Sequence, residues 1–111
     1  QAKNYDKKLE SLRVKKQIIS EDTLSARHLY IIRVPHKKHG KLFEILRSEN
    51  IGVNLHYQPV HLQPYYRKIG FKEGNFPESE SYAHEAISLP IFPSMTEKQQ
   101  NNIIKILEKE L

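Results

Sequence analysis

The sequence has no cysteine among its 111 residues and only four glycines, which stand apart from one another. Without cysteine there is neither a disulfide framework nor thiolate chemistry, and isolated glycines do not form a phosphate-binding loop. The longest hydrophobic candidate, residues 29–32, stops at Arg33, far short of the ~20 residues of a transmembrane helix. The first twenty residues are mostly polar or charged, unlike a signal peptide. We therefore predict a cytoplasmic protein without a membrane partner.

The residue patterns of common hydrolytic sites are also missing. Two histidine pairs occur, His36 with His39 and His56 with His61, but there is no H-E-x-x-H motif, and the H-E dipeptide at His84 lacks its second histidine. No serine stands in a G-x-S-x-G elbow. These absences argue against a metal site and against a serine hydrolase.

The length and the charge set the next limits. The chain has the size of one domain, with a net charge of +5 and a pI near 9.4. This charge permits an anionic partner, but lysines and arginines are spread from residue 3 to residue 109 with acids among them. A solvated surface explains most of this charge.

The N-terminal part, residues 1–20, is predicted to be a linking helix and a short extended piece. Apolar residues recur at helical spacing over residues 3–12, and residues 16–20 follow as the extended piece. An amphipathic helix at the start of a chain whose first residue is not Met leads us to expect a fragment of a longer protein.

The remainder is predicted to form an α/β (α+β) domain with a small sheet and packed helices. Runs of branched and aromatic residues, bounded by proline or glycine, place three strands at residues 28–34, 51–57 and 87–89. After a polar loop that ends at Gly40, helical spacing and capping signals predict helices over residues 42–48, 65–69, 77–86 and from Thr96, which forms a capping box with Gln99.

A polar and aromatic loop follows the second predicted strand. Residues 54–66 hold two imidazoles, three phenols and several amides, groups that hydrogen-bond to or stack on a sugar or a nucleotide. A structural loop pinned by its prolines and tyrosines explains the same composition. The tyrosines also lack the interleaved basic row of a nucleic-acid-binding surface. The residues alone leave the binding site and the structural loop open.

Several blocks of this sequence resemble the DegT family of sugar aminotransferases. They are G-V-N-L-H-Y-Q-P-V-H-L-Q-P-Y-Y at 52–66, F-P-E-S-E at 76–80 and S-L-P-I-F-P at 88–93, with S-A-R-H-L-Y at 25–30 resembling the start of the family's small domain. The blocks occur in the family's order and cover residues 24–111. The first block is most similar to the branch that aminates a UDP-4-keto-6-deoxy-N-acetylhexosamine on the route to pseudaminic acid.

The resemblance implies the C-terminal small domain of a fold-type-I aminotransferase, with a mostly antiparallel sheet of about three strands. In such an enzyme pyridoxal 5'-phosphate (PLP) forms a Schiff base with a lysine, accepts an amino group from glutamate and passes it to C4 of the sugar. The family's motif around that lysine is absent here. The resemblance therefore implies no catalytic residue and no bound cofactor in this chain alone, and a homodimeric parent enzyme.

The resemblance also implies where the substrate binds. In the family the small domain closes over the sugar nucleotide, and the segment after its second strand faces the active site. Carried onto this chain, it predicts as substrate-binding residues Asn54, Leu55, His56, Tyr57 and His61. The alternative is a stand-alone binding module for an anionic ligand, such as a nucleic acid or a nucleotide sugar, and salt-sensitive binding would distinguish a nucleic acid. We favour the aminotransferase and predict no nucleic-acid partner.

Overall fold

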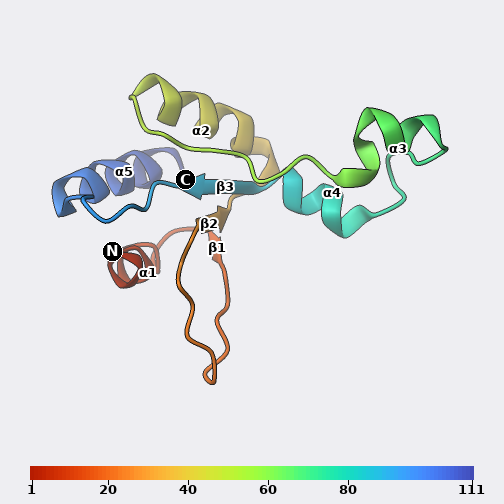
Figure 1. Ribbon diagram of the computed structural model, residues 1–111. Coiled ribbons are helices and arrows are strands. Elements are labelled where there is room, and N and C mark those ends of the chain that lie inside the picture. The colour runs from red at the N-terminus through yellow and green to blue at the C-terminus, as the bar shows by residue number, and fades with distance from the viewer.

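The structure is a computed structural model that describes residues 1–111 (Figure 1). In chain order the elements are α1 (Ala2–Lys8), β1 (Lys15–Lys16), β2 (Tyr30–Arg33), α2 (His36–Ser48), the 3-10 helix η1 (Val60–Leu62), α3 (Pro64–Lys68), α4 (Pro77–Ala83), β3 (Ala86–Leu89) and α5 (Glu97–Glu110). None of the helices has the length and hydrophobicity that crossing a membrane requires.

The sheet has three antiparallel strands in the order β1–β2–β3. β2 lies in the centre and pairs with β3 from Tyr30 opposite Leu89 to Arg33 opposite Ala86. Tyr30 and Ile32 point into the core, in the alternation expected of a strand. The predicted fold class, helices packed on a small antiparallel sheet, is confirmed.

One predicted strand, residues 51–57, is wrong. Only Asn54 pairs with the sheet, in a single bridge to Ser88 at the free edge of β3. Val53 is fully buried, but the chain leaves the sheet from Leu55 onward, where its side chains become exposed. Burial therefore alternates along residues 51–54, where the apolar side chains pack into the core, and this alternation ends where the core ends.

Other boundaries also differ from the sequence prediction: α1 ends at Lys8 rather than at residue 12, and α4 ends at Ala83 rather than at residue 86. α2 begins directly after Pro35, so the predicted polar loop up to Gly40 is its first turn. This turn has no side-chain cap and no acidic residue, the usual signals of a helix start, and it is polar because most of it faces solvent. The extended piece predicted at residues 16–20 pairs only at its beginning, as β1, which supplies the third strand.

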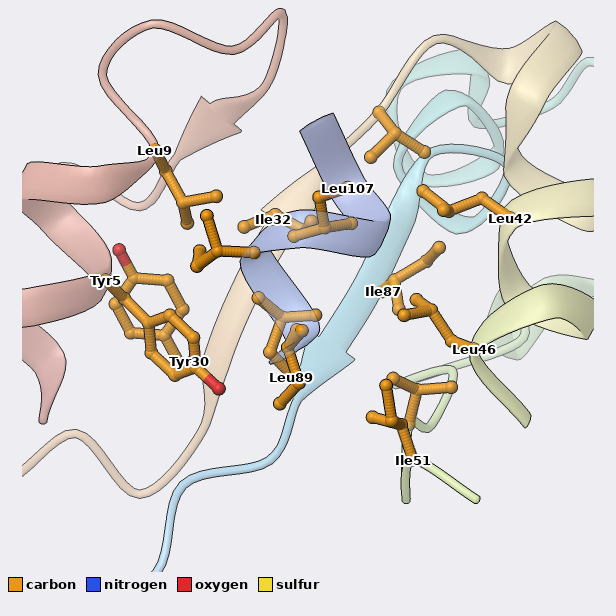
Figure 2. Packing of buried hydrophobic residues seen from close by; sticks show 14 of the residues in the cluster. Tyr5, Leu9, Tyr30, Ile32, Leu42, Leu46, Ile51, Ile87, Leu89 and Leu107 are labelled. Carbon is orange, nitrogen blue, oxygen red and sulfur yellow. The ribbon is translucent and has the colours of Figure 1, made fainter. Parts of the chain in front are cut away.

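A single apolar cluster joins the sheet to the helices on it. Figure 2 shows Leu42 and Leu46 of α2 pointing toward Ile87 of β3, and Leu107 of α5 lying near Ile32 of β2. All five side chains are at most 1% exposed. Complete burial of a side chain of this size contributes about 1.5–3 kcal/mol, so this cluster supplies most of the stability of the fold.

α5 carries the predicted capping box. The Thr96 hydroxyl oxygen accepts from the Gln99 N–H at 3.2 Å, and Gln99 Oε1 accepts from the Thr96 N–H at 2.8 Å. Two of the N–H groups that a helix start leaves without partners are thereby satisfied. The apolar stripe of Ile103, Ile104 and Leu107 on α5 is buried.

α1 packs onto the same core through the contact of its Tyr5 with Tyr30 of β2. The Tyr5 ring centroid lies 4.8 Å from that of Tyr30, and the Tyr30 hydroxyl donates to the Asp6 carboxylate at 2.6 Å. Burial raises the pKa of both phenols well above the usual range, and the Asp6 hydrogen bond and charge raise the pKa of Tyr30 further. Both tyrosines therefore remain neutral donors at physiological pH.

Two segments extend from the core (Figure 1). Residues 17–29 form a long loop beyond the ends of β1 and β2, and residues 55–76, which include α3, project past α4; we call the latter segment the arm. The radius of gyration is 15.4 Å, larger than the roughly 13 Å expected of a compact domain of this length. The arm carries most of the residues that the sequence singled out.

Candidate functional site

The arm leaves the sheet beside Ser88, in the middle of β3. The Ser88 N–H donates to the Asn54 carbonyl at 2.9 Å, and the Asn54 N–H donates to the Ser88 carbonyl at 3.3 Å. These two backbone bonds hold the first residue of the predicted site against the rigid sheet. The side chains that follow therefore start from a defined position.

His56 is anchored to the same serine. Its Nδ1 lies 2.7 Å from Ser88 Oγ, and its ring meets that of Tyr57 edge to face, with centroids 4.6 Å apart. Tyr57 itself is 73% exposed. The histidine is thus fixed by a hydrogen bond, whereas the phenol of Tyr57 is free to meet a ligand.

A hollow of about 510 Å³ opens at the base of the arm, within the size range of small-molecule sites. Its lining comes from the arm, α2, α4 and β3, and consists of His39, Leu55, His56, Tyr57, Gln58, Pro59, Leu62, Arg67, Glu73, Ala83, His84 and Ala86. A larger groove between α1 and α5, of about 830 Å³, has a single hydrophobic side chain in its lining. The mixed apolar and polar lining of the first hollow is the one typical of a ligand site.

Cationic and neutral donors outnumber acids around this hollow. His39 Nε2 lies 3.1 Å from the Ala86 carbonyl, to which it donates, and the exposed His84 ring stacks on His36 with centroids 4.7 Å apart. Arg67 donates through Nε to the Leu62 carbonyl at 2.9 Å. One carboxylate, that of Glu73, belongs to the lining. The hollow therefore favours a ligand with acceptor oxygens or negative charge.

His61, in contrast, turns away from the hollow. It is 6% exposed, and its Nε2 lies 2.7 Å from Glu80 Oε1, while its ring packs edge to face on Phe76. The Glu80 carboxylate also accepts from the Gly74 N–H at 2.9 Å and the Phe76 N–H at 3.3 Å. The Gly74 amide, helped by His61, holds the pKa of Glu80 below its usual range. This cluster closes the loop between α3 and α4.

The predicted site residues thus fall into two groups. Leu55, His56 and Tyr57 line one hollow, whereas Asn54 and His61 are absent from its lining. Asn54 contributes backbone bonds to the sheet edge, and His61 helps to shape the arm. No cluster of three or more His, Asp or Glu side chains suited to a metal ion occurs anywhere in the chain.

The basic side chains of the hollow that sequence reasoning missed are His39, Arg67 and His84. The sequence indicates His39 and His84 only as possible metal ligands, and no motif includes Arg67. They come from α2, α3 and the end of α4, so no local spacing in the sequence relates them to Tyr57. Only the tertiary arrangement of α2, α3 and α4 brings them to one hollow.

Comparison with known proteins gives this fold and this site their context. Residues 1–108 match the model of the DegT/DnrJ/EryC1/StrS aminotransferase family. The chain belongs to this family. The resemblance found in the sequence is thereby confirmed.

Three relatives illustrate the match. The spore coat polysaccharide biosynthesis protein SpsC of Bacillus subtilis is 38% identical over 93 residues, which make up 78% of this chain and 24% of that protein. The PLP form of a putative sugar aminotransferase of Streptococcus pneumoniae superposes with a TM-score of 0.86 at 27% identity, over 98% of this chain and 30% of that one. PseC of Helicobacter pylori, an aminotransferase involved in the biosynthesis of pseudoaminic acid, superposes with a TM-score of 0.85 at 22% identity, over 98% and 30%. The chain therefore spans less than a third of the length of these relatives.

The residues of the hollow do not fit PLP. The cofactor needs a lysine for its Schiff base, and no lysine belongs to the lining. The hollow can offer a sugar or a phosphate hydrogen-bond donors and an aromatic face, but its lining supplies no lysine for the cofactor. The chemistry that this site supports is binding and orientation.

Proposed function

We propose that this chain is the small domain of a PLP-dependent aminotransferase that transfers an amino group from glutamate to C4 of a UDP-4-keto-6-deoxy-N-acetylhexosamine. Residues 1–20 link it to the cofactor-binding part of the full-length protein, and residues 24–111 form its body. The observation that carries the proposal is the hollow where Leu55, His56 and Tyr57 meet Arg67. The family membership and the sequence run at residues 52–66 support the choice of substrate.

The chemistry of such a substrate suits this lining. A UDP-sugar offers hydroxyl groups, an acetamido group and a diphosphate. Tyr57 and His56 supply hydrogen-bonding groups, and Leu55 and Pro59 supply apolar surface for the sugar ring or its methyl groups. Arg67 uses only its Nε within the chain, so its terminal nitrogens are available to the diphosphate.

The proposal extends to a homodimer of the full-length protein in the cytoplasm. The arm exposes several large apolar side chains, among them Val60 (62%), Ile69 (57%) and Phe76 (50%). Exposed apolar patches mark contact surfaces, and the resembling family builds its active sites across a dimer interface. Sedimentation of the full-length protein tests this part, and a strict monomer at high concentration would count against it.

The experiment that tests the reaction uses the full-length protein loaded with PLP. Glutamate is added while the absorbance band of the bound cofactor is followed, and the UDP-4-keto-6-deoxyhexosamine is added afterwards. We expect glutamate to remove the band and the keto sugar to restore it. A protein that shows no PLP band would contradict the proposal and leave the hollow as a site for an anionic ligand only.

Tyr57→Phe then tests the contribution of the hollow. Loss of one neutral hydrogen bond should raise the KM for the sugar nucleotide about 2- to 10-fold, and the reaction with glutamate should be unchanged. Tyr65→Phe is the matched control, because Tyr65 is a similarly exposed tyrosine of the arm outside the lining. Equal effects of the two substitutions would refute the assignment of Tyr57 to the sugar nucleotide.

A further inference from the structure

Ser88 joins the sheet to the candidate site through three hydrogen bonds. It lies opposite Ile31 in the sheet, exchanges two backbone bonds with Asn54 and places its Oγ 2.7 Å from His56 Nδ1. The residue is 5% exposed. The other residues of β3, Ala86, Ile87 and Leu89, are apolar. The Ser88 hydroxyl has a specific partner in His56, and an alanine at this position could not make that hydrogen bond.

The burial of Ser88 decides which of the two groups donates. The Ser88 hydroxyl makes no hydrogen bond other than the one to His56, and no buried side-chain nitrogen or oxygen in the structure lacks a partner. If the hydroxyl only accepted from Nδ1–H, its own proton would be buried without an acceptor, which folded proteins avoid. The hydroxyl therefore donates, and Nδ1 accepts.

We propose that Ser88 is a positioning residue that holds His56 in the tautomer with its proton on Nε2, so that His56 presents an N–H donor to the ligand. The only hydrogen bond of the His56 ring is the one through Nδ1, and since no buried side-chain nitrogen is left without a partner, Nε2 is accessible to solvent. His56 belongs to the lining of the hollow. This inference rests on the proposed function for its ligand, an acceptor oxygen of the sugar or of the diphosphate. The tautomer itself does not depend on that function.

The two imidazoles of the arm differ in this respect. His61 directs its Nε2 into the chain, toward the Glu80 carboxylate, and is absent from the lining of the hollow. His56 is tied through the opposite ring nitrogen, Nδ1. The position of the internal bond on the ring thus decides that His56 serves the ligand and that His61 serves the fold.

The first test reads the tautomer by NMR of the full-length protein labelled with ¹⁵N-histidine, at a pH above the titration of the imidazole. The signal that disappears in His56→Gln belongs to His56. We expect its Nδ1 to show the chemical shift of an unprotonated nitrogen and its Nε2 that of a protonated one. In Ser88→Ala the two forms should mix, and Ser88→Thr, which keeps the hydroxyl, should restore the single form. A protonated Nδ1 in the unsubstituted protein would overturn the proposal.

The second test measures the KM for the UDP-4-keto-6-deoxyhexosamine. His56→Gln places an amide N–H near the position of Nε2–H and should retain binding, whereas His56→Ala should raise KM roughly 3- to 10-fold. Ser88→Ala should raise KM in the same direction with kcat little changed. Ser81→Ala is the control, because its hydroxyl is also partly buried and hydrogen-bonded but contacts Glu85 and Arg33 instead.

The outcomes separate the inference from the proposed function. If His56→Ala raises KM and Ser88→Ala does not, the positioning role of Ser88 is refuted while the function stands. If neither changes KM but NMR shows the expected tautomer and its loss in Ser88→Ala, the positioning role stands and the proposed place of the sugar nucleotide is refuted.

Discussion

The core and the arm of this chain are held by different forces. In the core, side chains such as Ile32, Leu46 and Leu107 are completely buried, and their apolar contacts are numerous and non-directional. The arm exposes most of its large apolar side chains and owes its shape to a few polar groups, chiefly Glu80 and Ser88. The candidate site thus depends on individual hydrogen bonds, whereas the stability of the fold depends on total burial.

Deleting part of a core side chain should have the largest effect on stability. Leu107→Ala should lower the free energy of unfolding by about 2–5 kcal/mol, because it removes buried methyl groups and leaves a cavity. The matched control is Leu24→Ala in the long loop, where Leu24 is 99% exposed, and a change within about 0.5 kcal/mol is expected. Urea denaturation of both variants measures the difference. Similar losses at the two positions would show that the long loop is packed and that the stability of the fold does not depend chiefly on burial in the core.

Removing the helix cap should have an intermediate effect. Thr96→Ala takes away the hydroxyl that accepts from the Gln99 N–H, and should cost about 1 kcal/mol. Thr23→Ala is its control, since the Thr23 hydroxyl contacts only the exposed side chain of its neighbour Asp22. Thermal or urea unfolding of the pair tests the prediction, and an unchanged Thr96→Ala variant would mean that α5 is held by packing alone.

Removing the carboxylate in α4 that holds the arm should have the smallest effect on overall stability and a clear local effect. Glu80→Gln replaces the carboxylate that accepts hydrogen bonds from the Gly74 and Phe76 amides and from the His61 ring. The amide resonances of Gly74 and Phe76 should shift and lose protection from hydrogen exchange, while those of β2 and β3 remain as they are. A variant that unfolds the core as readily as Leu107→Ala does would contradict the separation of the two regions.

The same carboxylate predicts a pH dependence of the arm. The pKa of Glu80 is lower in the folded chain than its ordinary value of 4.5, so the folded state holds the charged form more strongly than the unfolded state does. The resulting stabilisation is complete above pH 4.5 and is lost as the pH falls through the folded pKa. The Gly74 amide resonance should therefore move on acidification below 4.5, and Glu80→Gln should abolish this movement. A shift that persists in the variant would point to another titrating group.

Sequence reasoning succeeded where the signal was local. The capping box at Thr96, the short helix near residues 65–69 and the strand around Ile32 are each specified by residues a few positions apart, and all three are present in the structure. The strand predicted at residues 51–57 failed because its alternation says nothing about how far the partner strand extends. The start of α2 was missed because its first turn lacks the usual capping residues.

The candidate site was only partly predictable for the same reason. The motif singled out Leu55, His56 and Tyr57, which do line one hollow, and their role as ligand-binding residues stays a prediction. Nothing in the motif distinguishes His56 from His61, since both are histidines of one polar loop. Their partners, Ser88 and Glu80, stand 32 and 19 residues away.

The sequence by itself determined the family, the fold class and the principal helices, because these follow from local periodicity, capping and a contiguous motif. The tertiary structure decided which side chains of the arm face the hollow and which hold the fold. It also brought His39 and Arg67 to the site from two different helices. Hydrogen bonds between groups that lie far apart in the chain form only when the core has set the distance between them. No local sequence pattern specifies this distance.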